Sequence, residues 1–118
     1  MSAALIAQSV EARRGQERRR FFRRVMVVLN GQPAFEARPF DISNDGVGIT
    51  IDLCLARGTS CALSFQLPVA GDALFTVEVT AVVVYSTLSG QMGGFKTGMQ
   101  FQNPTAQVAS AIQTYVTG

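Results

Sequence analysis

Two short stretches of this 118-residue chain carry side chains whose types and spacing could bind a ligand. The first stretch is the arginine run Arg18-Arg19-Arg20-Phe21-Phe22-Arg23-Arg24, and the second is Asp41-Ile42-Ser43-Asn44-Asp45-Gly46. The planar guanidinium fork of arginine bonds phosphate oxygens in bidentate fashion, whereas lysine supplies only a point charge. A carboxylate accepts hydrogen bonds, a hydroxyl both donates and accepts them, and a glycine allows a sharp turn with a positive φ. The two stretches together indicate a binding site for an anionic ligand.

The charge of the chain is unevenly distributed. Seven arginines and two glutamates lie between Glu11 and Arg24, so this segment carries a net charge of +5. The other residues carry three basic and six acidic side chains, which gives them a net charge of −3. Such a concentration indicates one local anion site and not a basic surface all round the molecule.

The spacing Arg19-x-x-x-Arg23 followed by Asp41-x-Ser43-x-x-Gly46 resembles the two halves of the PilZ domain signature, RxxxR and (D/N)xSxxG. The resemblance covers residues 16–101, and Gly98-Met99-Gln100-Phe101 is similar to the strand with which the family usually ends. The family binds the bacterial second messenger cyclic di-GMP, and its fold is a six-stranded β-barrel. The resemblance implies that this chain is a cyclic di-GMP receptor and not an enzyme. It also implies signalling to a protein effector that controls motility, biofilm or exopolysaccharide.

The resemblance further implies a ligand site made of residues from both halves. Its members would be Arg18, Arg19 and Arg23 as main contacts, Arg20 and Arg24 as secondary contacts, and Asp41, Ser43 and Gly46. In the family, an arginine immediately before RxxxR is associated with two intercalated cyclic di-GMP molecules per domain, so Arg18 implies two. The arginine fork also matches guanine O6 and N7, and an Asp41 carboxylate suits the N1–H and N2–H groups of guanine. Two plainer interpretations stay open, because arginine runs are often only solvated and such turns often bond only their own backbone.

Alternation of apolar residues predicts the strands that position these side chains. We expect six strands, at residues 22–29, 34–40, 47–51, 61–67, 74–87 and 95–101, with turns at 30–31 and 41–46. Asn103 is expected to cap a C-terminal helix over about residues 103–116, with Pro104 at its first position. These elements favour an all-β fold, a six-stranded antiparallel barrel with a short C-terminal helix. Residues 16–118 would form this domain, and residues 1–15 a flexible arm or, alternatively, one or two docked helical turns.

Two expectations concern side chains that share a face. Alternate residues of an extended segment point the same way, so Arg19, Phe21 and Arg23 would line up if the arginine run is extended. In the strand at 74–87, Tyr85 falls on one face with the apolar residues that precede it. Three further apolar residues are expected to lie under the C-terminal helix, or else to serve a partner or a dimer: Val82, Val84 and Leu88.

The composition argues against several classes of function. The chain has no histidine and only two cysteines, Cys54 and Cys61, which we expect to be buried and unpaired. No nucleophile–base pair and no metal-ligand cluster is evident, so we expect neither catalysis nor a metal site. No targeting signal is evident, and no apolar run approaches the roughly 20 residues that span a bilayer. These features favour a cytoplasmic protein.

Two other functions stay open. A small β-barrel with a basic arm can bind single-stranded nucleic acid, but the predicted strands lack a row of exposed aromatic residues. A ligand-independent interaction module, monomeric or weakly dimeric, is the nearer alternative, because some family members lack the signature. This chain departs from the signature at neither half. We therefore expect cyclic di-GMP and an unidentified protein effector as partners, with no nucleic acid and no membrane insertion. We expect the arm to change conformation when the ligand binds.

Overall fold

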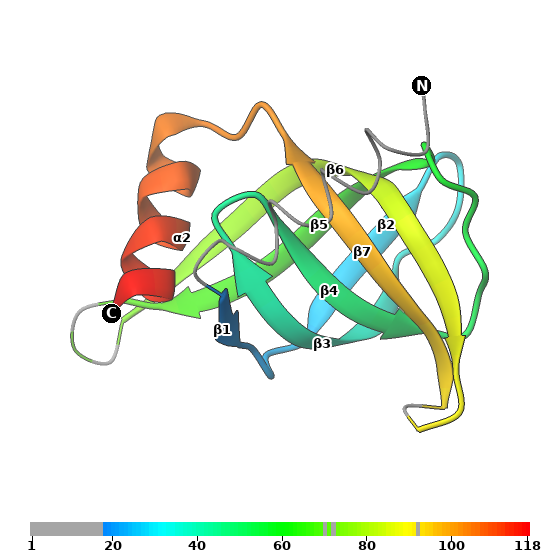
Figure 1. Ribbon diagram of the computed structural model, residues 1–118. Helices are drawn as coiled ribbons and strands as arrows, with labels where there is room; N and C mark the ends of the chain where they lie inside the picture. The colour runs from blue at the N-terminus through cyan, green and yellow to red at the C-terminus, as the bar shows by residue number, and fades with distance from the viewer. Residues whose placement is uncertain (1–17, 70, 72, 92) are drawn as a thin grey trace, which may run out of the picture.

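The computed structural model describes residues 18–69, 71, 73–91 and 93–118, so the predicted arm at residues 1–15 lies outside the described residues. Within these described residues, seven strands and one helix follow one another, with the labels of Figure 1. They are β1 (Arg18–Arg20), β2 (Val25–Leu29), β3 (Phe35–Ser43), β4 (Gly46–Ile51), β5 (Ser60–Pro68), β6 (Leu74–Ser89), β7 (Gly94–Gln102) and α2 (Ala106–Thr117).

The sheet closes on itself through β3. The strand order β3-β2-β5-β6-β7-β4 returns to β3 because β3 pairs with β2 along one edge and with β4 along the other, and every pairing is antiparallel. The short strand β1 pairs with the end of β3, opposite residues 41–43, on the same edge that β2 occupies at residues 35–37. The predicted six-stranded antiparallel barrel with a C-terminal helix is therefore confirmed.

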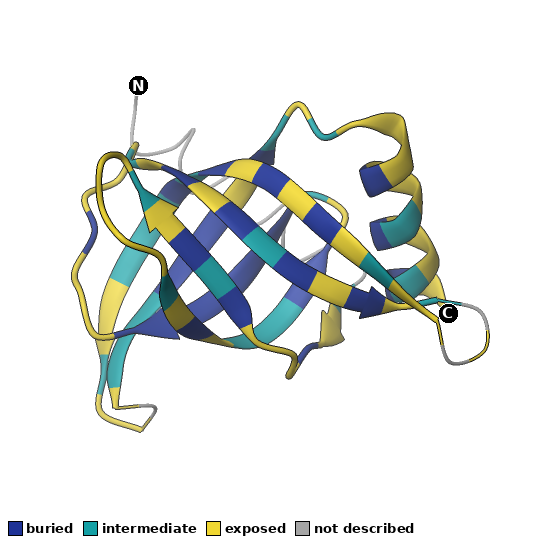
Figure 2. Ribbon diagram, turned by 180° about the vertical axis from the view of Figure 1, so that it is seen from behind, coloured by how far each residue is buried: buried dark blue, intermediate teal, exposed yellow. Residues whose placement is uncertain are grey.

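Alternate residues of each strand fill the barrel interior, as the predicted periodicity requires. Figure 2 shows buried and exposed residues alternating along the strands. In β5 the buried residues are Cys61, Leu63, Phe65 and Leu67. Cys54, the other cysteine of the chain, is exposed, so the prediction that both cysteines are buried was wrong for Cys54. Burial raises the pKa of the Cys61 thiol, which makes this sulfur a poor nucleophile.

Helix α2 closes one end of the barrel and begins later than predicted. Its N-cap is Thr105, whose hydroxyl accepts a hydrogen bond from the Val108 amide at 3.2 Å. The prediction of Asn103 as the cap was wrong, because Asn103 adopts a positive φ of 45° that ends the preceding strand and is not helical. Three residues of α2 are buried against the barrel: Val108, Ile112 and Val116.

The C-terminal helix does not cover the apolar patch of β6 as expected. Figure 1 shows α2 at one end of the barrel and the β6–β7 hairpin at the other. Leu88, in that hairpin, is 71% exposed, whereas Val82 and Val84 are half-buried within the strand. The helix instead contacts β1, β3, β5 and β6 at the end where the arginine run begins.

The predicted turn at residues 41–46 is shorter in the structure. Strand β3 continues to Ser43 and β4 starts at Gly46, so only Asn44 and Asp45 turn. Asp41 and Ser43 are therefore strand residues whose side chains share one face of β3. The expected positive φ at Gly46 was wrong, since Gly46 is not among the described glycines with positive φ.

We expect the two adjacent phenylalanines of the arginine run to differ in their effect on stability. Phe21 is fully buried and makes edge-to-face contacts with Phe65 and Tyr115, at ring-centroid distances of 5.4 and 5.8 Å. Phe22 is 75% exposed. Phe21→Ala should lower the free energy of unfolding by about 3–5 kcal/mol because it leaves a cavity in the core. Phe22→Ala should lower it by about 0.5 kcal/mol or less. Urea unfolding followed by circular dichroism measures both, and equal losses would show that the core does not extend to Phe21.

Candidate functional site

An ion pair joins the two polar stretches on the outside of the barrel. Arg18 lies opposite Ser43 in the β1–β3 pairing, and Asp41 is two residues from Ser43 on the same face of β3. The guanidinium of Arg18 donates from Nη2 to Oδ1 of Asp41 at 2.6 Å and from Nε to Oδ2 at 2.9 Å. The two side chains are 23% and 25% exposed, so water reaches the pair from one side only. Bidentate contacts of this kind are among the stronger hydrogen bonds in proteins.

The electrostatic surroundings of Arg18 stabilise its charged form. The hydrogen bond to Asp41 raises the pKa of Arg18, partial burial opposes the rise, and electrostatic interactions with Asp41 and Tyr85 add to it. Tyr85 of β6 lies near the same outer face, because its ring packs against Gly98, which is paired with Gly48, the residue opposite Asp41. Arg18 therefore offers a permanent positive charge held in a defined orientation.

Ser43 shapes the turn between β3 and β4. Its hydroxyl donates to the carbonyl of Gly46 at 3.4 Å and accepts from the amide of Asp45 at 3.3 Å. Ser43 is fully buried. The carbonyl of Asp45 in turn accepts the amide of Phe101 at 2.7 Å, which fixes the turn to β7. In this conformation Ser43 and Gly46 hold the backbone in place, and direct contact of Ser43 with a ligand stays a prediction.

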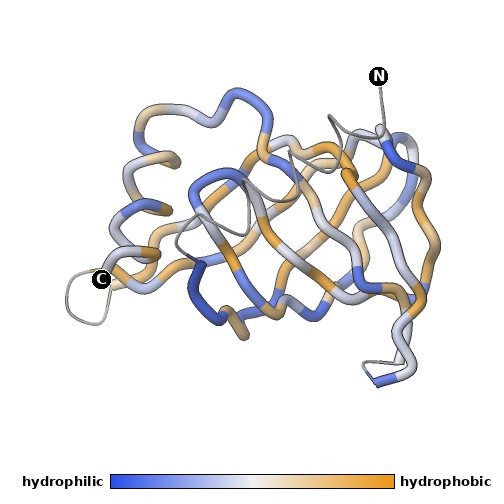
Figure 3. Tube along the Cα trace, viewed as in Figure 1, coloured by the Kyte–Doolittle hydropathy of each residue, from blue (hydrophilic) through white to orange (hydrophobic). Residues whose placement is uncertain are grey.

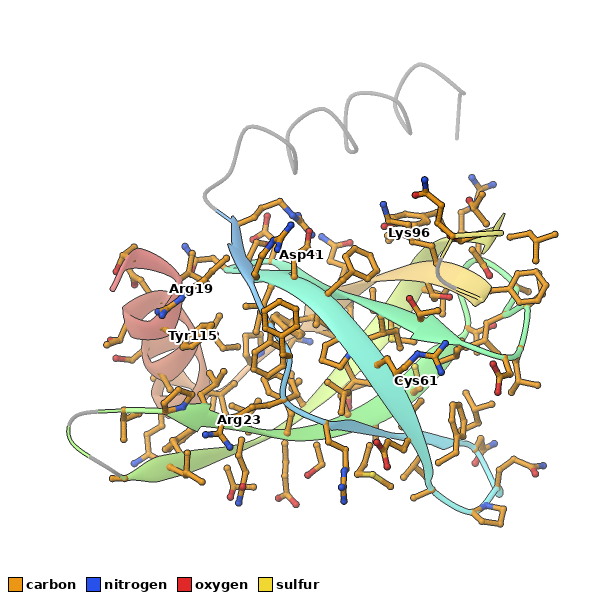
Figure 4. All side chains as sticks on the ribbon, turned by 90° about the horizontal axis from the view of Figure 1, so that it is seen from below. Arg19, Arg23, Asp41, Cys61, Lys96 and Tyr115 are labelled. Atoms are coloured by element: carbon orange, nitrogen blue, oxygen red, sulfur yellow. The ribbon has the colours of Figure 1, made fainter. Side chains whose placement is uncertain are left out.

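Arg19 points to the other face of β1 and contacts the C-terminal helix. Its Nη1 donates to the backbone carbonyl of Tyr115 at 2.7 Å, and its guanidinium carbon lies 4.1 Å from the centroid of the Tyr115 ring. The hydroxyl of Tyr115 donates to the carbonyl of Arg20 at 3.1 Å. Figure 4 shows Arg19 and Tyr115 side by side, with Asp41 on a neighbouring strand. One predicted ligand contact thus anchors a helix in this structure.

The remaining arginines of the predicted site differ in their surroundings. Arg20 is exposed and directly opposite Asp41 in the strand pairing. Arg24 forms an exposed ion pair with Glu36, with Nε 3.3 Å from Oε1. Figure 4 shows Arg23 on the other side of the barrel from Asp41. Its participation in the same site, like that of Arg24, stays a prediction.

The predicted alignment of Arg19, Phe21 and Arg23 was wrong. The chain leaves the strand conformation after Arg20 and resumes it at Val25, so alternate residues between them do not share a face. The ring of Phe21 turns into the core, whereas Arg19 and Arg23 are exposed. Figure 3 shows β1 and the β3–β4 turn as hydrophilic stretches on a mainly apolar barrel. The structure therefore brings together Arg18, Arg20 and Asp41 beside that turn.

Two residues of the site region were not found from the sequence. Tyr115 holds Arg19 from 96 residues away, and no local spacing signals such a contact. Tyr85 was expected on the same face of its strand as Val83, but a register shift between the two residues reverses the alternation, and the Tyr85 ring lies over Gly98. A bulge of this kind adds one residue to a strand and turns the following side chains to the opposite face.

Among the residues that the structure describes, no three histidine, cysteine, aspartate or glutamate side chains gather as a metal site. Within those same residues, no helix has the length and hydropathy required to cross a bilayer.

Comparisons with solved structures support the fold. The structure entitled inhibitor of motility (MotI/DgrA) from Bacillus subtilis superposes with a TM-score of 0.77 at 18% identity, covering 87% of this chain and 49% of that one. The PilZ domain of YcgR from Escherichia coli with c-di-GMP superposes with a TM-score of 0.60 at 16% identity, covering 89% of both chains. PlzA of Borreliella burgdorferi in complex with c-di-GMP superposes with a TM-score of 0.57 at 12% identity, covering 93% of this chain and 45% of that one. The chain thus spans about half the length of the MotI/DgrA structure.

Sequence comparison assigns the family directly. A comparison with curated proteins gives no significant match. The family model described as PilZ domain matches residues 12–118, which include both predicted signature halves, the whole barrel and the C-terminal helix. The chain therefore belongs to the PilZ domain family, whose domains are non-catalytic receptors for cyclic di-GMP.

Proposed function

We propose that this chain is a cyclic di-GMP receptor that passes the signal to a protein partner. The observation that carries the proposal is the bidentate Arg18–Asp41 pair, which lies on an outer face where the two signature halves meet. Two similar structures, YcgR and PlzA, are described with cyclic di-GMP, and MotI/DgrA is described as an inhibitor of motility. These relatives support a role in control of motility or of a related surface behaviour.

The chemistry of the pair suits both parts of the ligand. The fork of Arg18 can bond a phosphate or the O6 and N7 atoms of guanine, and the Asp41 carboxylate can accept from the N1–H and N2–H groups of guanine. In the structure each group satisfies the other. Binding therefore exchanges this internal ion pair for contacts with the ligand, and the energy gained is the difference between the two sets of contacts.

The complete proposed site includes residues that the structure holds elsewhere. We infer Arg18, Arg19 and Arg23 as main contacts, with Arg20, Arg24, Asp41, Ser43 and Gly46 in support. For Arg19 to reach the ligand, it must leave the carbonyl and the ring of Tyr115. Ligand binding would then loosen the contact between β1 and α2, and would reorder residues 1–15 if they form an arm. A partner protein could then distinguish the ligand-free surface around β1 and α2 from the ligand-bound one.

Replacing the Asp41 carboxylate tests whether this side chain binds the ligand or only contributes to the surface charge. Asp41→Asn should weaken cyclic di-GMP binding by roughly tenfold, equivalent to about 1.4 kcal/mol, because the amide cannot accept two guanine hydrogens. Glu36→Gln is the matched control, since Glu36 also pairs with an arginine but in an exposed position. Isothermal titration calorimetry measures both variants. Equal affinities for the two would remove Asp41 from the site, and absence of heat with the unchanged protein would favour the ligand-independent interaction module.

The Arg19–Tyr115 contact should compete with the ligand. Arg19→Ala should weaken binding by about tenfold because a charge-assisted bond is lost. Tyr115→Leu should strengthen binding by about two- to fivefold, since it removes the ring contact that Arg19 must give up. The same calorimetric titration gives both values, with circular dichroism to verify that α2 persists. Weaker binding by Tyr115→Leu would show that the contact and the ligand do not compete.

The number of cyclic di-GMP molecules bound per chain tests the proposed role of Arg18. The unchanged protein should bind two cyclic di-GMP molecules per chain, and Arg18→Leu should bind one. The expected reason is that a second, intercalated molecule needs a guanidinium to stack on and pair with. The calorimetric stoichiometry reports the number directly, and a ratio of one for the unchanged protein would contradict the inference.

A further inference from the structure

Two glycines face each other across β4 and β7 on the outside of the barrel. Gly48 and Gly98 are directly paired, and both are buried. A Cβ atom at Gly48 would lie 2.4 Å from Cζ of Phe40, and one at Gly98 would lie 2.1 Å from Cε2 of Tyr85. Only glycine allows rings to approach the sheet so closely. Two aromatic rings therefore lie flat against the outer backbone at adjacent positions; we call Phe40, Gly48, Tyr85 and Gly98 the aromatic shelf.

A β-bulge in β3 and another in β6 orient these two rings. On β3 the register shifts between Pro39, opposite Ile49, and Asp41, opposite Gly48. Phe40 and Asp41 therefore both face Gly48, and a Cβ there would also lie 2.8 Å from Oδ1 of Asp41. The equivalent shift on β6 brings Tyr85 opposite Gly98. Bulges are frequent next to functional sites, where they redirect a side chain.

Cationic side chains surround the shelf. The ammonium nitrogen of Lys96 lies 4.9 Å from the centroid of the Phe40 ring. Arg38 is in the same cross-strand row as Lys96, through Thr50, and donates to the carbonyl of Gly93 at 3.1 Å. On the other side, Arg18 bonds Asp41, whose Oδ1 lies beside Gly48. Figure 4 shows Asp41 and Lys96 on one side of the barrel, away from Arg23 and Cys61.

We propose that the aromatic shelf is a base-stacking subsite for a purine nucleotide, with Lys96 and Arg38 beside it to neutralise phosphate. The rings of Phe40 and Tyr85 are half-buried, aromatic rings of this kind stack with planar bases, and a cation beside them attracts the phosphate. The shelf is continuous with the Arg18–Asp41 pair, because Asp41 touches both. A base that stacks on the shelf thus presents its edge to the carboxylate. The inference rests on the proposed function for the identity of the ligand, but the stacking chemistry stands on the shelf itself.

Nuclear magnetic resonance and calorimetry together test the subsite. The chain has only two tyrosines, so Tyr85→Phe assigns the ring signals of Tyr85 and Tyr115. Titration with cyclic di-GMP should shift the Tyr85 ring protons upfield through stacking. Tyr85→Leu and Phe40→Leu should each weaken binding by about tenfold. Tyr85→Phe keeps the ring and should stay within about threefold of the unchanged protein.

Phe95→Leu is the matched control, since it removes a ring from the opposite face of β7 and should leave binding unchanged. If cyclic di-GMP binds but the Tyr85 signals do not move and both leucine variants bind normally, the subsite is wrong and the receptor function stands. If cyclic di-GMP does not bind at all, the receptor function is wrong. A parallel titration with GMP then decides the subsite: an upfield shift of Tyr85 supports it, and no shift overturns it.

Discussion

The pairing of β3 with both β1 and β2 along one edge is the constraint on which the site depends. β3 closes the barrel by bonding β2 and β4, and its last residues remain available for β1. Residues 18–20 and 41–43 are thereby joined in register, although more than 20 residues separate them in the sequence. The Arg18–Asp41 pair is a direct consequence, because the register brings an arginine and a carboxylate to diagonal positions on one face. Without barrel closure the two signature halves have no reason to meet.

The barrel and most of its strands could be predicted because alternation of apolar residues is a local signal. β5 shows this most clearly, since Cys61, Leu63, Phe65 and Leu67 are buried in the predicted order. Bulges carry no comparable signal, and one extra residue reverses the alternation. Tyr85 was for this reason expected on the same face as Val83, and it lies on the opposite, outer face. The prediction of the N-cap was wrong for a similar reason. Thr105 and Asn103 are both good capping residues, and only the backbone conformation at each residue shows which one caps the helix.

The candidate site was predictable in its residue types and less so in its geometry. The resemblance assigned Arg18 and Asp41 to one ligand site, and the structure shows these two side chains bonded to each other, whereas their contact with a ligand stays a prediction. The resemblance did not indicate that Ser43 would be buried or that Arg19 would contact a helix 96 residues away. The contact of Arg19 is a tertiary one with Tyr115, whose ring also packs against Phe21 at 5.8 Å, and Ser43 is buried while its hydroxyl bonds the turn at residues 44–46. Contacts between residues so far apart in the sequence leave no local pattern.

Strand geometry divides an apparently uniform arginine run into side chains with different partners. Successive residues of β1 point to opposite faces, so Arg18 turns to the outer face with Asp41 and Arg19 turns to the end of the barrel with Tyr115. Both positive charges are satisfied by the protein before any ligand arrives. A ligand that draws both arginines to one place must therefore break contacts on two faces of the same strand. Because one of those faces carries α2, the proposed receptor function would couple occupation of the outer face to attachment of the helix through the three residues of β1.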